Sequence, residues 1–276
     1  EYPQTMEAYA AAKARLFHWE GLRAAVINHD DAVGRALIAG TSEPLVLAYG
    51  LSERPADLPA SVQWVGAASV QTTANGMSAT LALGDERLSF ATRIIGRHNL
   101  SNLLAVAAVL VAQGLSPAEI VVHLARLQPP AGRMACQGGD NAPLVVVDYA
   151  HTPDALTHIL AALRDVTTAR GGRLICVFGC GGDRDPGKRP EMGRAAALGA
   201  DNVVVTSDNP RWETPDAIIA AIVDGAPGAT VIEDRAEAIA TIIAAAAAED
   251  VVLLAGKGHE QTQEIRGQYY PFDDAM

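Results

Sequence analysis

Leu174-Ile175-Cys176-Val177-Phe178 and Asn202-Val203-Val204-Val205-Thr206 are two short apolar runs, and each leads directly into a charged loop that glycine or proline interrupts. The loops are Gly179–Pro190 and Ser207–Arg211, and a short helical pattern lies between them. Alternation of strand and helix predicts a parallel sheet. Ligands of such sheets bind outside the carboxyl ends of the strands. We therefore expect both loops on one rim, together with four basic side chains: Arg184, Lys188, Arg189 and Arg211.

The first loop contains the spacing of a phosphate-binding P-loop, because Gly182–Lys188 reads G-x-x-x-x-G-K. Arg189 stands where that motif needs Ser or Thr to bind magnesium. Pro186 removes one backbone N–H, and the two aspartates of the loop would repel a triphosphate. We therefore interpret the loop as a mixed-charge site for a ligand with both a carboxylate and an amine. The alternative is a solvated turn, which the similar charge of the second loop disfavours.

The composition is that of an acidic protein with one large or two ordinary domains. The 276 residues carry a formal net charge of −11, which argues against unspecific nucleic-acid binding. Three cysteines without a C-x-x-C pattern indicate a reducing compartment, and we expect the cytoplasm. No apolar run approaches the roughly 20 residues of a membrane span, and no signal peptide is visible. The chain begins at Glu1 inside a helical pattern, so we expect a fragment.

The second half of the chain alternates strands and helices after a proline-rich linker. The linker, Gln128–Gly132, separates an expected domain at residues 1–130 from one at 131–276. The pattern predicts an α/β domain with a mostly parallel, doubly wound sheet. Its strands are expected at Leu144–Val147, Leu174–Phe178, Asn202–Thr206, Thr230–Ile232 and Val251–Ala255, with Tyr269–Phe272 as a last edge strand. Its helices are expected at Pro153–Val166, Pro190–Leu198, Pro215–Ile222 and Ala236–Ala247.

The first half combines the same alternation with a run of hairpin-like strands. Helices are expected at Met6–Phe17, Ala32–Ala39, Leu103–Gln113 and Pro117–Leu127, the last with Ser116 as its cap, and strands at Arg23–Asn28 and Leu45–Tyr49. From Val62 to Ile94, alternating residues predict a small antiparallel sheet with one solvated face. Asn99 and Asn102 lie one turn apart, so their amides could bind a base edge or a ribose. A helix cap explains Asn99 equally well.

Two further polar clusters follow strands of the second half. Asp148-Tyr149-Ala150-His151 ends the first strand, and Gly256–Glu260 ends the last strand of the alternation. Polar groups at the same end of successive strands favour a ligand site over a purely structural role. Asp148 and His151 would also fit a hydrolase, but no Ser or Cys nucleophile elbow accompanies them.

The order of these motifs resembles that of the Mur ligases, the ATP-dependent amide-forming enzymes of peptidoglycan synthesis. The motifs are Thr5–Lys13, Gly96–Asn102, Ala131–Met134, Asp148–Asp154, Gly179–Pro190, Asp208–Arg211 and Gly256–Glu260. The resemblance implies three domains, of which this chain would hold the C-terminal part of the central ATPase domain and the whole Rossmann-like third domain. The true phosphate loop and the domain for the UDP sugar would precede Glu1. The resemblance therefore implies that this fragment is inactive alone.

Within the family, Asp-Asn-Pro-Arg marks the members that add meso-diaminopimelate, and this chain has that sequence at positions 208–211. An arginine can bind the distal carboxylate of diaminopimelate in a bidentate manner, and acidic side chains can bind the distal ammonium. Lysine lacks that carboxylate and would leave an arginine unpaired. The resemblance implies seven residues for this amino acid: Arg184, Asp208, Asn209, Pro210, Arg211, Gly256 and Glu260.

The resemblance also implies contacts with ATP and Mg²⁺. The positions that match nucleotide contacts are Asn99, Asn102, Arg133 and Asp148, and those that match catalytic residues are Lys13, Lys188 and His151. Lys13 matches a lysine that carbon dioxide converts to N6-carboxylysine, a carbamate that acts as a carboxylate toward Mg²⁺. This reaction requires a deprotonated, desolvated amine.

The implied reaction is amide formation through an acyl phosphate. ATP would phosphorylate the γ-carboxylate of UDP-N-acetylmuramoyl-L-alanyl-D-glutamate, and the amine of meso-diaminopimelate would displace the phosphate. We expect a monomer that binds these small molecules, and neither nucleic acid nor membranes. Three alternatives stay open. A Rossmann oxidoreductase would need G-x-G-x-x-G after the first strand, which is missing. A non-catalytic binding module is the second, and a folate-type polyglutamate ligase, disfavoured by Asp208–Arg211, is the third.

Overall fold

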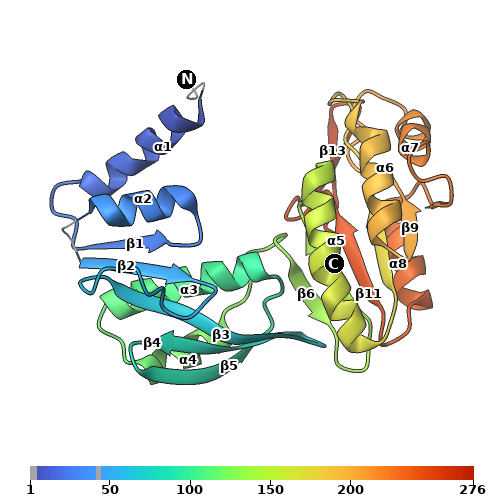
Figure 1. The fold of residues 1–276 in the computed structure, drawn as a ribbon. Coiled ribbons are helices and arrows are strands. Elements are labelled where there is room, and N and C mark those ends of the chain that lie inside the picture. The colour runs from blue at the N-terminus through green and yellow to red at the C-terminus, as the bar shows by residue number, and fades with distance from the viewer. Residues whose placement is uncertain (1–4, 42–44) are drawn as a thin grey trace. The chain divides into compact units, whose positions relative to one another are not determined.

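The computed structural model describes residues 5–41 and 45–276 of the chain, which folds into two compact units (Figure 1). Unit 1 comprises Glu1–Gln71, Met77–Thr92 and Arg97–Leu127. Unit 2 comprises Thr72–Gly76, Arg93–Gly96 and Gln128–Met276. Each unit has its own sheet and its own buried core, so each is described by itself.

Unit 2 is built on a six-stranded sheet with the strand order β10-β9-β8-β11-β7-β6. All neighbouring strands run parallel except β6, which is antiparallel to β7. The expectation of a mostly parallel, doubly wound sheet is confirmed. The strands are β6 (Ala135–Gly138), β7 (Leu144–Asp148), β8 (Leu174–Phe178), β9 (Asn202–Val205), β10 (Thr230–Val231) and β11 (Val251–Ala255).

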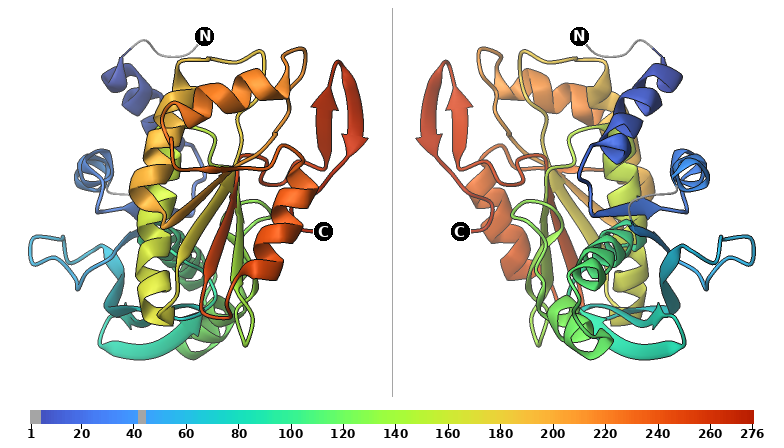
Figure 2. Two further views of the ribbon diagram at one scale, coloured as in Figure 1. Left: turned by 90° about the vertical axis from the view of Figure 1, so that its right-hand side faces the viewer. Right: turned by 90° about the vertical axis from the view of Figure 1, so that its left-hand side faces the viewer.

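Helices cover both faces of this sheet, as Figure 2 shows edge-on. Three helices pack on one face, α5 (Pro153–Arg170), α6 (Lys188–Gly199) and α7 (Pro215–Val223), and α8 (Arg235–Ala245) packs on the other. Successive side chains of β8 divide between the two cores, with Cys176 and Phe178 facing α5–α7 and Val177 facing α8. Burial on both faces explains why these strands are continuous apolar runs in the sequence.

The end of unit 2 differs from the expectation. Tyr269–Phe272 is not an edge strand of the main sheet, so that prediction is wrong. Instead β13 (Gln268–Pro271) pairs antiparallel with β12 (Thr262–Ile265) in a separate hairpin. Arg266 and Gly267 form its turn with φ of 50° and 75°, and positive φ at both central residues is typical of a two-residue hairpin turn.

Unit 1 contains a five-stranded sheet with the order β1-β2-β3-β4-β5. The strands are β1 (Ala24–Asn28), β2 (Leu45–Gly50), β3 (Gln63–Thr73), β4 (Gly76–Leu83) and β5 (Glu86–Thr92). β4 and β5 are antiparallel, but β3 runs parallel to β2, so the expectation of a separate antiparallel sheet is wrong in part. The first half of β3 is buried on both faces and only its second half alternates. The strand therefore belongs to the parallel part and to the hairpin part at once.

The helices of unit 1 are α1 (Met6–Ala14, followed by a 3-10 turn at Arg15–His18), α2 (Ala32–Gly40), α3 (Arg97–Ala112) and α4 (Pro117–Arg126). Ser116 caps α4 in a capping box with Glu119, as the sequence predicts. α3 begins at Arg97 and not at Leu103, so Asn99 lies inside the helix and not at its cap. In the ranges 5–41 and 45–276, no helix combines the length and apolar character that a bilayer crossing requires.

Candidate functional site

The carboxyl ends of four central strands of unit 2 lie level with one another. Ala255 of β11 is aligned with Asp148 of β7 and with Phe178 of β8, and Phe178 is aligned with Val205 of β9. The four polar loops identified in the sequence therefore start from one edge of the sheet, which is where open parallel sheets bind their ligands.

Asn209 connects three of these loops. Its side chain is buried, its Nδ2 donates to Oε2 of Glu260 at 2.8 Å, and its Oδ1 accepts from the backbone N–H of Glu264 at 3.0 Å. Oδ1 also accepts from Nζ of Lys257 at 3.1 Å. The backbone carbonyl of Asn209 accepts from the N–H of Gly182 at 2.9 Å. Asn209 thus joins the loops after β8, β9 and β11 through its side-chain amide and its backbone carbonyl.

Lys257 lies at the centre of this group, and the sequence analysis does not single it out. The side chain is fully buried, and Nζ donates to Asn209, to Oε2 of Glu260 at 3.3 Å and to the carbonyl of Thr262 at 2.7 Å. Gly256 and Gly258 flank it with φ of 111° and 56°. Such backbone conformations favour glycine, so a lysine between two glycines at a strand end is the signal that could have identified it.

Arg211 is held by the β12–β13 hairpin. Its Nε donates to Oε2 of Glu264 at 3.0 Å, and its Nη1 donates to the carbonyl of Gly182 at 2.7 Å. The backbone N–H of Arg211 donates to the carbonyl of Glu264, and the carbonyl of Arg211 accepts from the N–H of Arg266. The backbone is left-handed here, with φ of 52°. The hairpin therefore fixes both the main chain and the guanidinium of this arginine.

Arg184 is exposed and approaches Arg211 beside Gly181. A Cβ atom added to Gly181 would lie 2.8 Å from Nη1 of Arg211 and 3.7 Å from Cγ of Arg184. The missing side chain thus leaves room for both arginines at one point of the loop. Pro210 is buried behind them, and its carbonyl accepts from the N–H of Glu213 at 3.0 Å. Two arginine side chains that start from neighbouring loops are suited to a carboxylate ligand.

Asp208 is a buried carboxylate in a cluster of charges. Burial raises its pKa above the ordinary value of 3.8, while Arg235 and Lys257 act in the opposite direction and Glu260 and Asp274 add to the rise. Arg235 is itself fully buried and forms a bidentate pair with Asp274 at 2.7 and 2.6 Å. Three carboxylates against two cations leave one negative charge in the cluster, so an ammonium group would balance it.

Gly256 makes room for the carboxylate of Asp208. A Cβ atom at this position would lie 2.6 Å from Oδ2 of Asp208, and the φ of 111° favours glycine independently. The structure therefore brings together Asp208, Asn209, Arg211, Gly256 and Glu260, with Arg184 beside Arg211.

A second group, basic and aromatic, surrounds Tyr149 at the end of β7. The guanidinium of Arg133 stands over the Tyr149 ring at 5.5 Å, and that ring lies 4.7 Å from His151 and 5.6 Å from His259, measured between centroids. Nζ of Lys188 donates to the carbonyl of His151 at 2.9 Å. A flat ring beside cationic groups is suited to a base or a phosphate. Sequence reasoning missed Tyr149 and His259.

Asp148 points into the protein. Asp148 is 4% exposed. Its Oδ1 accepts from the N–H of Ala150 at 2.7 Å, and its Oδ2 accepts from the N–H of Met134 at 2.8 Å. Asp148 therefore fixes the loop that carries Arg133, and in this structure it shapes the second group from behind.

The P-loop-like spacing forms no phosphate cradle. Arg189, which replaces the Ser or Thr, is buried and pairs with Glu213 through two bonds of 2.9 and 2.7 Å. Glu213 also accepts from the N–H of Asp183, and Asp185 accepts from the N–H of Gly187. Acidic side chains thus occupy backbone donors that a phosphate would need, which agrees with the mixed-charge interpretation.

The other predicted site residues lie in unit 1. Lys13 is exposed on α1, and its Nζ stands over the Tyr9 ring at 5.4 Å, so unit 1 does not supply the desolvation that carbamylation requires. Nδ2 of Asn102 donates to Oδ1 of Asn99 at 3.3 Å, so the two amides lie on one side of α3 and bind each other. Within residues 5–41 and 45–276, no group of three His, Cys, Asp or Glu side chains could hold a metal ion. A carbamylated Lys13 would supply a single ligand, so we derive no step through Mg²⁺.

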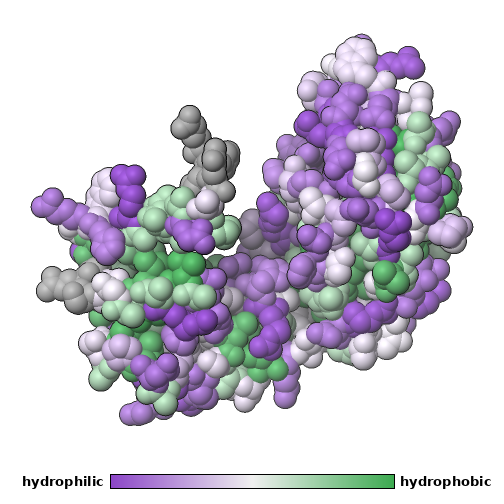
Figure 3. Space-filling model, turned by 45° about the horizontal axis from the view of Figure 1, so that its top comes forward, coloured by the Kyte–Doolittle hydropathy of each residue, from purple (hydrophilic) through white to green (hydrophobic). Residues whose placement is uncertain are grey.

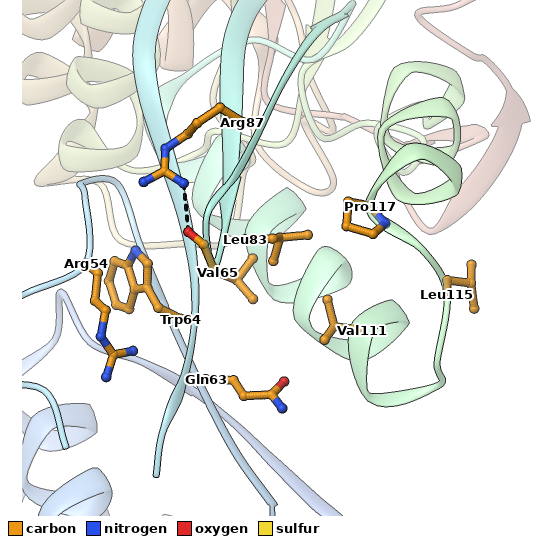
Figure 4. A pocket seen from close by; sticks show the side chains of 10 residues that line it. Arg54, Gln63, Trp64, Val65, Leu83, Arg87, Val111, Leu115 and Pro117 are labelled. Carbon is orange, nitrogen blue, oxygen red and sulfur yellow. Dashed lines mark hydrogen bonds between the residues drawn. The ribbon is translucent and has the colours of Figure 1, made fainter. Parts of the chain in front are cut away.

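The cavity of unit 1 in Figure 4 is a different kind of feature. It has a volume of about 400 Å³ and is lined mainly by apolar side chains, among them Val65, Leu83, Val111 and Leu115. Its two arginines are occupied, since Arg54 donates to three backbone carbonyls and Arg87 binds Glu53 and two carbonyls. Figure 3 likewise shows apolar side chains gathered on unit 1. None of the predicted site residues lines this cavity.

Two family matches cover most of the chain. Residues 1–110 match the Mur ligase middle domain, and residues 132–258 match the Mur ligase glutamate ligase domain. The chain is 48% identical over 278 residues to the UDP-N-acetylmuramoyl-L-alanyl-D-glutamate--2,6-diaminopimelate ligase of Ralstonia nicotianae, a match that covers 99% of this chain and 54% of the relative. It is 49% identical to the ligase of the same name from Pseudomonas aeruginosa, over 99% of this chain and 55% of the relative.

Solved structures agree with these matches. A structure of a UDP-N-acetylmuramoyl-L-alanyl-D-glutamate--2,6-diaminopimelate ligase superposes with a TM-score of 0.75 at 39% identity, over 99% of this chain and 56% of that one. A folylpolyglutamate synthase from Mycobacterium tuberculosis, with a TM-score of 0.61 at 21% identity over 93% of this chain and 58% of its own, shares the fold alone. The chain spans about half the length of the relatives it matches. Its motifs, its fold and these matches agree that the chain belongs to the Mur ligase family.

Proposed function

We propose that this chain is part of an ATP-dependent ligase that adds meso-diaminopimelate to UDP-N-acetylmuramoyl-L-alanyl-D-glutamate in the synthesis of peptidoglycan precursors. Relatives of that name match almost the whole chain, which supports the proposal. The observation that carries it is the arrangement around Asn209 in unit 2, where two guanidinium groups and a net negative cluster lie on neighbouring loops.

The proposed roles follow from charge. Arg211 and Arg184 bind the distal carboxylate of the amino acid, a role supported by the guanidinium of Arg211 and the side-chain stem of Arg184, which both lie beside Gly181. Asp208 and Glu260 bind the distal ammonium, since their cluster lacks one positive charge. Asn209 and Pro210 shape the loop that carries them. Together these residues select an amino acid that is zwitterionic at its far end, and they orient its other amine for attack.

Nucleotide contacts are proposed for each unit by itself. Arg133, Lys188 and His151 lie around Tyr149, which Asp148 supports, and Asn99 with Asn102 offers amides to the base or ribose. ATP with Mg²⁺ supplies the activated phosphoryl group when bound, and Lys13 as a carbamate would be a ligand of the metal. We also propose a monomer in the cytoplasm, and the free thiols of the three cysteines support a reducing compartment.

The proposal is tested by isothermal titration of the chain with meso-diaminopimelate and with L-lysine. Lysine should bind roughly 5- to 150-fold more weakly, since it lacks the distal carboxylate that Arg211 and Arg184 would bind. Equal affinities for the two amino acids would refute the proposed selectivity.

Arg211→Ala should remove this preference and leave binding of ATP unchanged. Arg211→Lys is the matched control, because it keeps the charge but loses the planar fork, and it should recover only part of the affinity. If Arg211→Ala weakened ATP and the amino acid alike, Arg211 would not belong to the amino-acid site.

A further inference from the structure

We propose that Lys257 is a positioning residue that presets Asn209 and Glu260 for the amino-acid substrate. This inference rests on the proposed function, because it concerns the same site in unit 2. Lys257 is fully buried, so it acts on a ligand through the side chains that it holds.

The burial of the ammonium group requires strong partners. An unpaired ammonium inside a protein is very unfavourable, so a buried lysine persists only where acceptors surround it. Nζ of Lys257 can donate three hydrogen bonds, and the structure supplies three acceptors: Oδ1 of Asn209, Oε2 of Glu260 and the carbonyl of Thr262. Every donor of Lys257 is thus directed at an element of the site, and none is left for a ligand.

These bonds determine which way the amide of Asn209 faces. Its Oδ1 receives two donors, Nζ of Lys257 and the backbone N–H of Glu264. A flipped amide would place NH₂ against both donors, so only one orientation is compatible with them. Nδ2 consequently faces Glu260 and donates one of its two hydrogens to Oε2 of Glu260, with 2.8 Å between the two atoms. This bond does not use the second hydrogen of Nδ2. A ligand carboxylate is the natural acceptor for that second hydrogen.

The same ammonium fixes Glu260. Oε2 accepts from both Lys257 and Asn209, which leaves Oε1 of this partly exposed carboxylate for another donor. Lys257 also neutralises one carboxylate of the cluster around Asp208, so that the remaining charge is a single negative one. A ligand with one ammonium and one carboxylate at its tip therefore meets a preset acceptor and a preset donor.

The experiment compares Lys257→Met with a matched control, Asp250→Asn. Asp250 is also a buried charged group with several bonds, but it pairs with Arg173 at the opposite, amino-terminal ends of β8 and β11. For both variants the melting temperature and the affinity for meso-diaminopimelate are measured. We expect both to lose stability, and only Lys257→Met to lose roughly tenfold or more in affinity, the effect of hydrogen bonds between charged groups.

A second readout reports on positioning itself. The side-chain NH₂ resonances of Asn209 should be displaced from those of a free asparagine amide in the wild type and in Asp250→Asn, and should move toward them in Lys257→Met. If Lys257→Met fails to fold, Lys257→Met with Glu260→Gln is measured against Glu260→Gln alone, so that the difference between the two reports on Lys257. The double variant should show the same change at Asn209.

Two outcomes would overturn the inference: unchanged Asn209 resonances in the Lys257 variants, or equal losses of affinity in Lys257→Met and Asp250→Asn. Failure of the proposed function is a separate result, because the wild type would then not bind meso-diaminopimelate at all. In that case the resonances of Asn209 still decide whether Lys257 orients this amide.

Discussion

At the scale of single residues, the binding role proposed for Asp208 and the stability of the fold oppose each other. Burial raises the pKa of its carboxyl group, and Glu260 and Asp274 add to the rise against Arg235 and Lys257. The folded chain therefore binds this proton more tightly than the unfolded chain does. Ionisation of Asp208 must lower the free energy of unfolding as the pH rises from the ordinary pKa of 3.8 through the raised value. Natural proteins keep such unfavourable groups chiefly at functional sites.

Asp208→Asn should consequently raise the melting temperature at neutral pH, because the amide has no ionisation cost. The gain over the wild type should shrink as the pH falls toward 3.8, where the folded wild type is protonated as well. Calorimetry of both chains between about pH 4 and pH 7 measures this difference. A gain that did not depend on pH would contradict the assignment of the effect to the carboxylate.

The three thiols should be unreactive in the folded chain. Burial raises the pKa of Cys136 to about 11 and those of Cys176 and Cys180 to about 12, and the thiolate is the reactive form. Ellman's reagent at mildly alkaline pH should therefore react slowly with the native chain and rapidly with all three thiols in denaturant. Fast reaction of native Cys136, the most accessible of the three, would show that its burial is transient.

At the scale of elements, the cap of α4 can be tested directly. Ser116 accepts from the N–H of Glu119, whose carboxylate in turn accepts from the N–H and hydroxyl of Ser116 at 2.9 and 2.6 Å. Ser116→Ala should cost about 1 kcal/mol in the free energy of unfolding, measured with urea. Thr214→Ala is the control, because the side chain of Thr214 makes no cap hydrogen bond on α7, and it should cost clearly less.

The same bonds lower the pKa of Glu119, chiefly through the hydroxyl of Ser116. The ionised carboxylate of Glu119 therefore adds to the free energy of unfolding above the ordinary pKa of 4.5. This contribution is lost as the pH falls through the lowered pKa. The difference in the free energy of unfolding between the wild type and Ser116→Ala should therefore become smaller at acidic pH. An equal difference at all pH values would mean that the carboxylate takes no part in the cap.

Elements with a strong local signal could be predicted from the sequence, and those set by distant partners could not. β8 and β11 are buried on both faces and appear as apolar runs, so their positions were confirmed. β6 has only four residues, none of them fully buried, and exists because it pairs with β7. The exposed β13 has no apolar alternation, and its pairing with β12 decides its place.

In the candidate site, too, the parts with a local sequence signal could be predicted, and the parts set by distant partners could not. The loops after β7, β8, β9 and β11 could be located, because a parallel sheet brings its strand ends together. The roles of Lys257 and Glu264 could not, since both bind Asn209, which lies about fifty positions away in the chain. Only the fold makes such residues neighbours.

At the scale of the whole molecule, the proposed amino-acid contacts all belong to unit 2, and each unit has its own core. Binding of meso-diaminopimelate should therefore slow hydrogen exchange at residues 208–211 and 256–265 and leave α4 of unit 1 unchanged. Exchange measured by mass spectrometry with and without the amino acid tests this expectation. Protection confined to unit 1 would place the amino-acid site elsewhere.

The β12–β13 hairpin supports the Arg211 loop through main-chain atoms. The N–H of Arg211 donates to the carbonyl of Glu264, and the carbonyl of Arg211 accepts from the N–H of Arg266. Such bonds do not use the side chain, although the φ of 52° disfavours β-branched residues and proline at that position. Under the proposed function, mutation there would alter which amino acid is accepted, while the main-chain support beneath it persists. On that proposal, a lineage could change the chemistry of its cell-wall cross-link by very few substitutions, while it inherits the same scaffold.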